Sequence, residues 1–300
     1  MNISTIIRFI SFGLVVIILI IGYNWVSSSF HYVPGATVRN TLDSAGEKRL
    51  FLLHVPSSYK AGDSLPLVFN FHGYESNAAQ QEQISEMSPL ADSANFIVVY
   101  PEGLGNPQAW QTGPEGLRDV DQEFIRDLVQ LLEAKLRIDP NRIYATGISN
   151  GAQMAIRLGC ETVDIFAAIA IVSGSYPSAE SCAPARPIPL IAFHGTADRS
   201  LPFNGGGLTG GYILPAREGA SKWAKRNGCA AWPEVTYQNG DVTGETWGDC
   251  RGNADVTFYT IHDGGHTWPG SNTALLYDIA TQDIDATQAI WEFFNSHPKP

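Results

Sequence analysis

The pentapeptide GISNG at residues 147–151 constrains the fold of this chain more than any other segment. It follows a short β-branched and aromatic run at residues 142–146 and precedes a helix-like run at residues 152–158. A G-x-S-x-G segment between a strand and a helix predicts a very tight turn with a strained serine backbone. Side chains two residues before and two residues after Ser149 would collide, so both positions need glycine. The turn is expected to hold the Ser149 hydroxyl clear of the sheet.

Short apolar runs typical of buried strands alternate with runs typical of amphipathic helices along the chain. This alternation predicts an α/β fold with a doubly wound, mostly parallel sheet and helices on both faces. Ligands of such sheets bind at the carboxyl ends of the strands. The expected elements are an opening hairpin at 37–41 and 49–55, strands at 67–71, 96–100, 142–146, 167–172, 190–193 and 256–261, and helices at 84–95, from Asp119 to 136, at 152–158 and at 281–295.

A carboxylate and a histidine follow two of these predicted strands. Asp198 comes just after the strand at residues 190–193, and His266 lies in a glycine-containing loop after the strand at residues 256–261. The order serine, acid, histidine is that of the α/β-hydrolases, in which the G-x-S-x-G turn is the nucleophile elbow. The carboxylate of such a triad fixes the histidine tautomer, and the histidine takes the serine proton. We therefore predict a catalytic triad of Ser149, Asp198 and His266.

Other residues compete for these roles on weaker grounds. His262 ends a strand, which favours a structural role, and His72 and His194 are expected to brace loops through backbone hydrogen bonds. An H-x3-H metal pair of His262 and His266 lacks a clear third ligand, so we predict no metal site. Asp198 directly follows a strand between the serine and the histidine, which sets it above four other carboxylates, Asp164, Asp249, Asp263 and Asp278.

The remaining site residues are predicted from their position near the triad. The backbone N–H of Asn150, next to the serine, is expected to form an oxyanion hole with that of Tyr74, with Glu75 as the alternative to Tyr74. Trp110 and Trp268 lie on loops near the predicted site and could stack on a sugar or an aromatic acyl group. Packing in the protein interior is the competing interpretation for both tryptophans.

Charge and composition exclude several classes of partner. The formal net charge is −11, with 30 acidic and 19 basic residues, so the chain has no basic stripe for nucleic acid. The Gly-rich stretch at residues 204–211 has no phosphate-loop lysine, which argues against a nucleotide site. Its two interpretations are a rim of the substrate cleft and a disordered insertion. We expect no cofactor and a monomer.

The N-terminal segment is predicted to direct the chain across a membrane. Arg8 is followed by an apolar run from Phe9 to Gly22, and no charged residue appears again until Arg39. This pattern is typical of a signal peptide, and retention as a membrane anchor is the alternative. We therefore divide the chain into a leader or anchor at residues 1–28 and a single catalytic domain at residues 29–300. The location is expected to be secreted or extracytoplasmic.

The four cysteines all lie beyond this leader. An even number in an exported chain predicts two disulfides, for which three pairings exist, and four buried thiols are the alternative. We favour the local pairing of Cys160 with Cys182 and of Cys229 with Cys250.

Several of these motifs together resemble one known family. The segments are residues 147–151, 193–198 and 264–270, together with 137–142 before the elbow strand and 227–229. They are similar to the secreted esterases grouped as poly(3-hydroxybutyrate) depolymerases and feruloyl or acetylxylan esterases, of carbohydrate esterase family 1 and its relatives. The resemblance covers residues 37 to 297. It implies an α/β-hydrolase fold, a triad at Ser149, Asp198 and His266, and disulfides between paired cysteines.

The resemblance is incomplete near the presumed cleft. The stretch 204–211 is longer than is usual in the family, and Tyr74 and Glu75 stand where smaller or less charged residues are expected. We predict a serine carboxylester hydrolase acting on feruloyl or acetyl esters of polysaccharides or on hydroxybutyrate esters. The alternative is a carbohydrate- or polymer-binding surface protein on the same fold with an idle triad.

Overall fold

A computed structural model describes residues 28–111, 119–176, 182–208, 211–273 and 278–300. Its strands, in chain order, are β1 (Ser28–Ser29), β2 (Ala36–Ser44), β3 (Glu47–Val55), β4 (Leu65–Phe71), β5 (Ile97–Pro101), β6 (Ile138–Gly147), β7 (Ala168–Val172), β8 (Leu190–Gly195), β9 (Gly206–Leu208), β10 (Gly211–Ile213), β11 (Glu234–Asn239), β12 (Val242–Trp247) and β13 (Val256–Ile261). Its helices are α1 (Ala78–Ser85), α2 (Met87–Ala94), α3 (Val120–Lys135), α4 (Asn150–Glu161), α5 (Ala216–Asn227) and α6 (Ala286–Ser296), with a short 3-10 turn at Arg251–Asn253.

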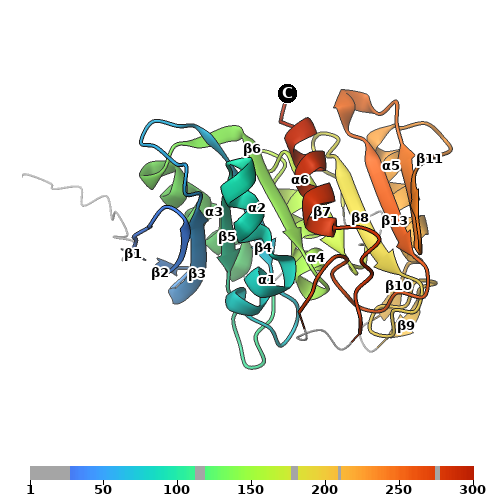
Figure 1. The fold of residues 1–300 in the computed structure, drawn as a ribbon, viewed down its shortest axis with the longest axis horizontal. Helices are drawn as coiled ribbons and strands as arrows, with labels where there is room; N and C mark the ends of the chain where they lie inside the picture. The colour runs from blue at the N-terminus through green and yellow to red at the C-terminus, as the bar shows by residue number, and fades with distance from the viewer. Residues whose placement is uncertain (1–27, 112–118, 177–181, 209–210, 274–277) are drawn as a thin grey trace, which may run out of the picture.

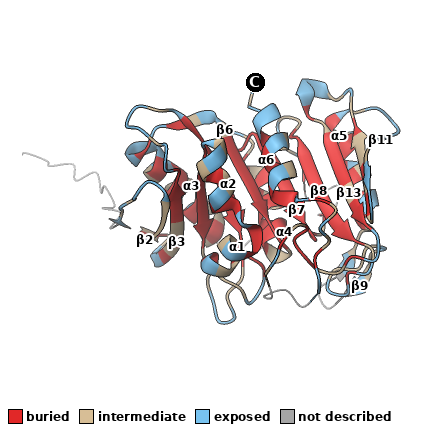
Figure 2. Cartoon of the chain, viewed as in Figure 1, coloured by how far each residue is buried: buried red, intermediate tan, exposed pale blue. Residues whose placement is uncertain are grey.

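An 11-stranded sheet in the order β1-β2-β3-β5-β4-β6-β7-β8-β13-β12-β11 forms the centre of the molecule (Figure 1). The central strands pair in parallel, in the order β5-β4-β6-β7-β8-β13. The strands at the two edges, β1-β2-β3 and β12-β11, pair antiparallel with their neighbours. Strands β4, β5, β7 and β8 are buried along their whole length, and β6 is buried over its second half (Figure 2). Parallel strands that are buried on both faces consist of nearly continuous apolar residues, so these strands could be predicted from the sequence.

Helices cover both faces of this sheet, as predicted. In Figure 1, α1, α2 and α6 lie in front of the sheet, and α3, α4 and α5 lie behind it. Successive residues of one strand therefore enter opposite cores. In β5, Ile97 and Val99 belong to the core with α3, α4 and α5, whereas Val98 and Tyr100 belong to the core with α1, α2 and α6. The predicted doubly wound α/β architecture is confirmed.

Two helix predictions need correction. The single helix expected at residues 84–95 is two helices, because Glu86 between them adopts a left-handed backbone conformation with φ 49°. The helix expected from residue 281 begins only at Ala286, where the Asp285 side chain accepts a hydrogen bond from Gln288 N and caps it. Helix α5 and the antiparallel strands β11 and β12 were not predicted, because their sequences are polar and only partly buried.

The Gly-rich stretch forms a small hairpin in which β9 pairs antiparallel with β10. The hairpin lies in the connection that follows Asp198, at the lower right of Figure 1. Residues 209–210 at its tip lie outside the described residues.

The predicted leader at residues 1–28 lies outside the described residues, except for Ser28. Among the helices of the described ranges, none is long and apolar enough to cross a membrane.

Both predicted disulfides are present. Cys160 is bonded to Cys182 and Cys229 to Cys250, which confirms the local pairing. The first bridge closes a loop between the end of α4 and the segment before β8, and the second ties the end of α5 to the turn after β12.

Removal of either bridge is expected to lower the free energy of unfolding by about 3 kcal/mol. The paired cysteines are 22 and 21 residues apart, and closing such a loop removes conformational entropy from the unfolded chain. Urea unfolding of the Cys229→Ala/Cys250→Ala protein and of the wild type measures the difference. Identical transition midpoints for the two proteins would contradict this expectation.

Candidate active site

The turn between β6 and α4 is as tight as the sequence predicts. Ser149 has φ 57° and ψ −120°, a conformation that L-residues rarely adopt. A Cβ atom on Gly147 would lie 2.6 Å from the Phe71 carbonyl oxygen, and one on Gly151 would lie 2.2 Å from the same atom. No side chain fits at such distances, so the two glycines allow the elbow to pack against the end of β4. Ser149 N donates to Val172 O at 3.0 Å, which ties the turn to β7.

Asp198 and His266 meet at the same edge of the sheet. They lie on the loops that follow the neighbouring parallel strands β8 and β13. His266 Nδ1 donates to Asp198 Oδ2 at 2.7 Å. Oδ1 of the carboxylate accepts hydrogen bonds from Ser200 N at 2.9 Å and Leu201 N at 2.8 Å. The Asp198 side chain is fully buried, and each of its oxygens is hydrogen bonded.

The environment of Asp198 favours its ionised form. Burial raises the pKa of a carboxyl group, but here the hydrogen bond and the charge of His266, the Leu201 N–H and the charge of His194 outweigh it. The pKa of Asp198 therefore lies below its usual value. A negative Asp198 stabilises a protonated His266, which a base needs after it accepts a proton.

Glycines let the two loops pack backbone against backbone. A Cβ atom on Gly195 would lie 2.2 Å from the Gly264 carbonyl oxygen, and Ala197 N donates to that oxygen at 2.8 Å. His266 N donates to Asp278 Oδ2 at 3.1 Å, so this carboxylate holds the histidine loop rather than the histidine ring. No motif around Asp278 indicates this role.

The competing histidines have structural contacts. His262 is exposed, and its ring bonds to Thr243 Oγ1. His72 is fully buried; its Nδ1 donates to Gly73 O at 2.7 Å, and its Nε2 accepts from Gly103 N at 2.9 Å. His194 Nε2 donates to Leu201 O at 2.7 Å, in the loop that carries Asp198. The predicted loop-bracing role of His72 and His194 is confirmed.

Ser149 lies at the end of β6, at the sheet edge where Asp198 and His266 meet. Among the described residues, no hydrogen bond of 3.5 Å or less joins the Ser149 hydroxyl to His266. Catalytic hydrogen bonds are often long in a protein without substrate and shorten in the complex.

Two backbone N–H groups border Ser149 without a hydrogen bond to another described residue. They belong to Asn150, the first residue of α4, and to Tyr74, in the loop after β4. A Cβ atom on Gly73 would lie 3.5 Å from Ser149 Cβ, which places this loop against the serine. The N–H of the alternative residue Glu75 already donates to Gln108 O at 3.0 Å. This arrangement favours Tyr74 over Glu75 as an oxyanion donor.

The prediction that Trp110 and Trp268 stack on a substrate is wrong. Trp110 is 3% exposed, and its indole N–H donates to His72 O at 3.0 Å. Trp268 is 1% exposed, and its indole N–H donates to Thr287 Oγ1 at 2.9 Å, on the side of the loop that faces α6. Both rings pack in the interior, so neither offers a face to a sugar or an acyl group.

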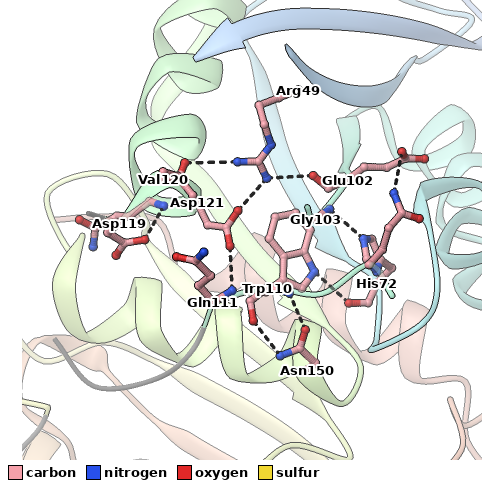
Figure 3. A network of polar contacts seen from close by, with 12 residues as sticks. Arg49, His72, Glu102, Gly103, Trp110, Gln111, Asp119, Val120, Asp121 and Asn150 are labelled. Carbon is pink, nitrogen blue, oxygen red and sulfur yellow. Dashed lines mark hydrogen bonds and ion pairs between the residues drawn. The ribbon is translucent and has the colours of Figure 1, made fainter. Parts of the chain in front are cut away.

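A buried ion pair with no sequence signature is bonded to the chain on both sides of Trp110 (Figure 3). Arg49 bonds to Asp121 Oδ1 at 2.7 Å and to Glu102 O at 3.0 Å. Asp121 Oδ2 accepts from Gln111 N at 2.7 Å. A single arginine in a strand and a single acid in a helix carry no sequence signal that they pair.

Because several histidines are buried, we expect the free energy of unfolding to fall in mild acid. Burial lowers the pKa of three histidines and is the main cause in each. The pKa of His72 is lowered to about 4, and those of His194 and His297 are also lowered. In the unfolded chain these imidazoles have a pKa near 6.5. Between about pH 6.5 and 4 the unfolded chain binds more protons, so the free energy of unfolding falls as the pH falls. Asp198 adds a loss only below its usual pKa of 3.8, because its folded pKa is depressed.

The thermal unfolding midpoint measured between pH 7.5 and 4.5 tests this expectation. His72→Gln removes one of the three histidines whose pKa is lowered by burial, so its midpoint should depend less steeply on pH than that of the wild type. Equal slopes would contradict the assignment to His72.

Comparisons with known proteins agree with this geometry. The family model described as Esterase PHB depolymerase matches residues 50–186. The putative esterase NocK of Nocardia uniformis subsp. tsuyamanensis is 31% identical over 250 residues, which cover 75% of this chain and 72% of that protein. Feruloyl esterase B of Piromyces equi is 32% identical over 234 residues, covering 73% of this chain, but this match spans only 42% of that protein.

A solved structure shares the fold. The acetyl xylan esterase from Aspergillus awamori superposes with a TM-score of 0.60 over 82% of this chain and 94% of its own, at 17% identity. Such a low identity supports the α/β-hydrolase fold alone. The sequence matches go further, and the chain belongs to the Esterase PHB depolymerase family of carboxylic ester hydrolases.

Proposed function

We propose that this protein is an exported serine esterase that cleaves feruloyl or acetyl esters on polysaccharides, or hydroxybutyrate esters, through an acyl-enzyme. The observation that carries the mechanism is the 2.7 Å hydrogen bond between His266 Nδ1 and the buried Asp198, at the sheet edge where the strained Ser149 elbow ends β6. The name of one relative, a feruloyl esterase, and the family description, a PHB depolymerase esterase, support two of these ester classes.

The proposed reaction has two halves. His266 Nε2 removes the Ser149 proton as the hydroxyl oxygen attacks the ester carbonyl, and the N–H groups of Asn150 and Tyr74 stabilise the oxyanion. His266 then protonates the leaving alcohol, which departs and leaves the acyl group on Ser149. A water, deprotonated by His266, attacks this acyl-enzyme and releases the acid, and the proton returns to Ser149. Asp198 holds Nδ1–H of His266 throughout.

We further propose that residues 29–300 form one catalytic domain and that residues 1–28 direct its export. Two disulfides support an oxidising compartment, because such bridges rarely persist in a reducing cytoplasm. Detection of the protein in the culture medium or on the cell surface, and not in the cytoplasm, tests the location.

A hydrolysis panel tests the substrate. Methyl ferulate, acetylated xylan and hydroxybutyrate oligomers differ in acyl group and alcohol, and kcat/KM for each identifies the preferred ester. The proposal expects turnover of at least one of the three. Failure on all three, by folded protein, would refute these substrate classes.

Covalent labelling distinguishes an enzyme from a binding protein with an idle triad. A fluorophosphonate probe reacts with a serine that a histidine activates, so the proposal expects stoichiometric labelling of the folded protein. A binding protein would remain unlabelled.

A further inference from the structure

The two proposed oxyanion donors are connected by hydrogen bonds through the buried Trp110 (Figure 3). Asn150 Oδ1 accepts from Trp110 N at 2.7 Å, and Asn150 Nδ2 donates to Trp110 O at 3.1 Å. The side chain of Asn150 thus pairs with one residue's backbone N–H and C=O at once. This double contact fixes the first turn of α4, from which the Asn150 N–H emerges.

Trp110 also contacts the loop that contains the other donor, the Tyr74 N–H. Its indole N–H donates to His72 O at 3.0 Å, and its ring packs edge-on against Phe71 with centroids 5.1 Å apart. The His72 carbonyl lies directly before Gly73 and Tyr74, so this hydrogen bond fixes the start of the loop that contains the Tyr74 N–H.

The His72 side chain acts on the donor peptide itself. Its Nδ1–H donates to Gly73 O at 2.7 Å, and Gly73 O belongs to the same peptide group as the Tyr74 N–H. The C=O and N–H of a trans peptide point in opposite directions. A hydrogen bond that fixes the carbonyl therefore aims the N–H, and it also polarises the peptide.

The loop that carries Trp110 is anchored on both sides of the tryptophan. Before the tryptophan, Arg49 donates to Glu102 O, and His72 Nε2 accepts from Gly103 N. After it, Asp121 Oδ2 accepts from Gln111 N. The His72 contact requires a neutral ring. Burial is the main cause that keeps the pKa of His72 at about 4, and the charge of Arg49 adds to it.

We propose that His72, Trp110 and the side chain of Asn150 are positioning residues that set the direction and separation of the two oxyanion donors. None of these side-chain groups touches the substrate; each acts through a backbone N–H. The inference rests on the proposed function, because the oxyanion hole is part of it.

Trp110→Phe tests the connection most selectively, because it removes the indole N–H and keeps an aromatic ring. Loss of a whole oxyanion donor lowers kcat by about 10²–10³-fold, and misdirection of one donor is expected to lower kcat by about 10-fold. KM should change by less than about twofold, because the ground-state ester makes weaker contacts with the donors. The inhibition constant of a boronic acid, which forms a tetrahedral adduct on Ser149, should rise in proportion to the fall in kcat/KM.

Trp223→Phe is the matched control. The Trp223 indole N–H also donates to a buried backbone carbonyl, Ile188 O, at 2.9 Å, but it lies on α5. This variant should lose as much stability as Trp110→Phe and keep the wild-type kcat and inhibition constant. Asn150→Asp is the second test variant; it has nearly the same shape but turns a carboxylate oxygen toward Trp110 O, and the same changes are expected.

The inference is overturned if Trp110→Phe and Asn150→Asp keep the wild-type kcat and inhibition constant, or if Trp223→Phe loses as much kcat as they do. Failure of the proposed function gives a different result, since the boronic acid would then leave the wild type uninhibited.

Discussion

Replacement of Ser149 by alanine is expected to lower the turnover of a nitrophenyl ester by about 10⁶-fold. The strained turn between Gly147 and Gly151 holds one side chain at the edge of the sheet, and alanine at this position leaves no nucleophile there. The backbone donors and the binding surface would remain, so only their small residual rate enhancement would persist. Initial rates with nitrophenyl acetate measure the effect.

Ser93→Ala is the control for this substitution. Ser93 is exposed on α2, and its hydroxyl donates to Leu90 O, so its loss should leave turnover unchanged. Substantial activity of folded Ser149→Ala protein would rule out the acyl-enzyme mechanism proposed for this residue.

Replacement of Asp198 by asparagine is expected to lower kcat by about 10⁴-fold. The reason lies in the two N–H groups of Ser200 and Leu201, which donate to Oδ1. An asparagine must present its carbonyl oxygen to these donors, so its NH₂ group faces His266 Nδ1. That nitrogen then has to accept a hydrogen bond, and the ring proton moves to Nε2. With Nε2 protonated, His266 cannot take the serine proton.

The kcat of Asp198→Asn between pH 6 and 9, together with that of Asp263→Asn, tests this tautomer argument. Asp263 is exposed, lies in the same loop as His266 and has a left-handed backbone that asparagine tolerates, so Asp263→Asn should resemble the wild type. Nearly full activity of Asp198→Asn would show that the carboxylate does not set the histidine tautomer.

The sequence predicts the parts of this site that local sterics determine. The glycines of the elbow are required by atoms of Phe71 that lie too close for a side chain, and such a requirement appears directly as G-x-S-x-G. The buried parallel strands appear as apolar runs, and polar residues that follow them mark the edge where Asp198 and His266 meet. Local pattern and strand order suffice for these conclusions.

Side-chain direction could not be predicted in the same way. Trp110 and Trp268 lie on loops near the site, but tertiary contacts turn both rings inward to reach buried acceptors. The break at Glu86 depends on a left-handed backbone conformation that glutamate rarely adopts. The pairing of Arg49 with Asp121 joins residues far apart in the chain, and it becomes visible only when the sheet and α3 are assembled.

A crystal structure of the protein after reaction with diethyl p-nitrophenyl phosphate would test the convergence of these groups most directly. The expected product has phosphorus bonded to Ser149 Oγ and the phosphoryl oxygen about 3 Å from the backbone nitrogens of Asn150 and Tyr74, with His266 Nε2 facing Ser149 Oγ. Phosphorus on another residue, or a His266 imidazole turned away from Ser149, would contradict the proposed mechanism.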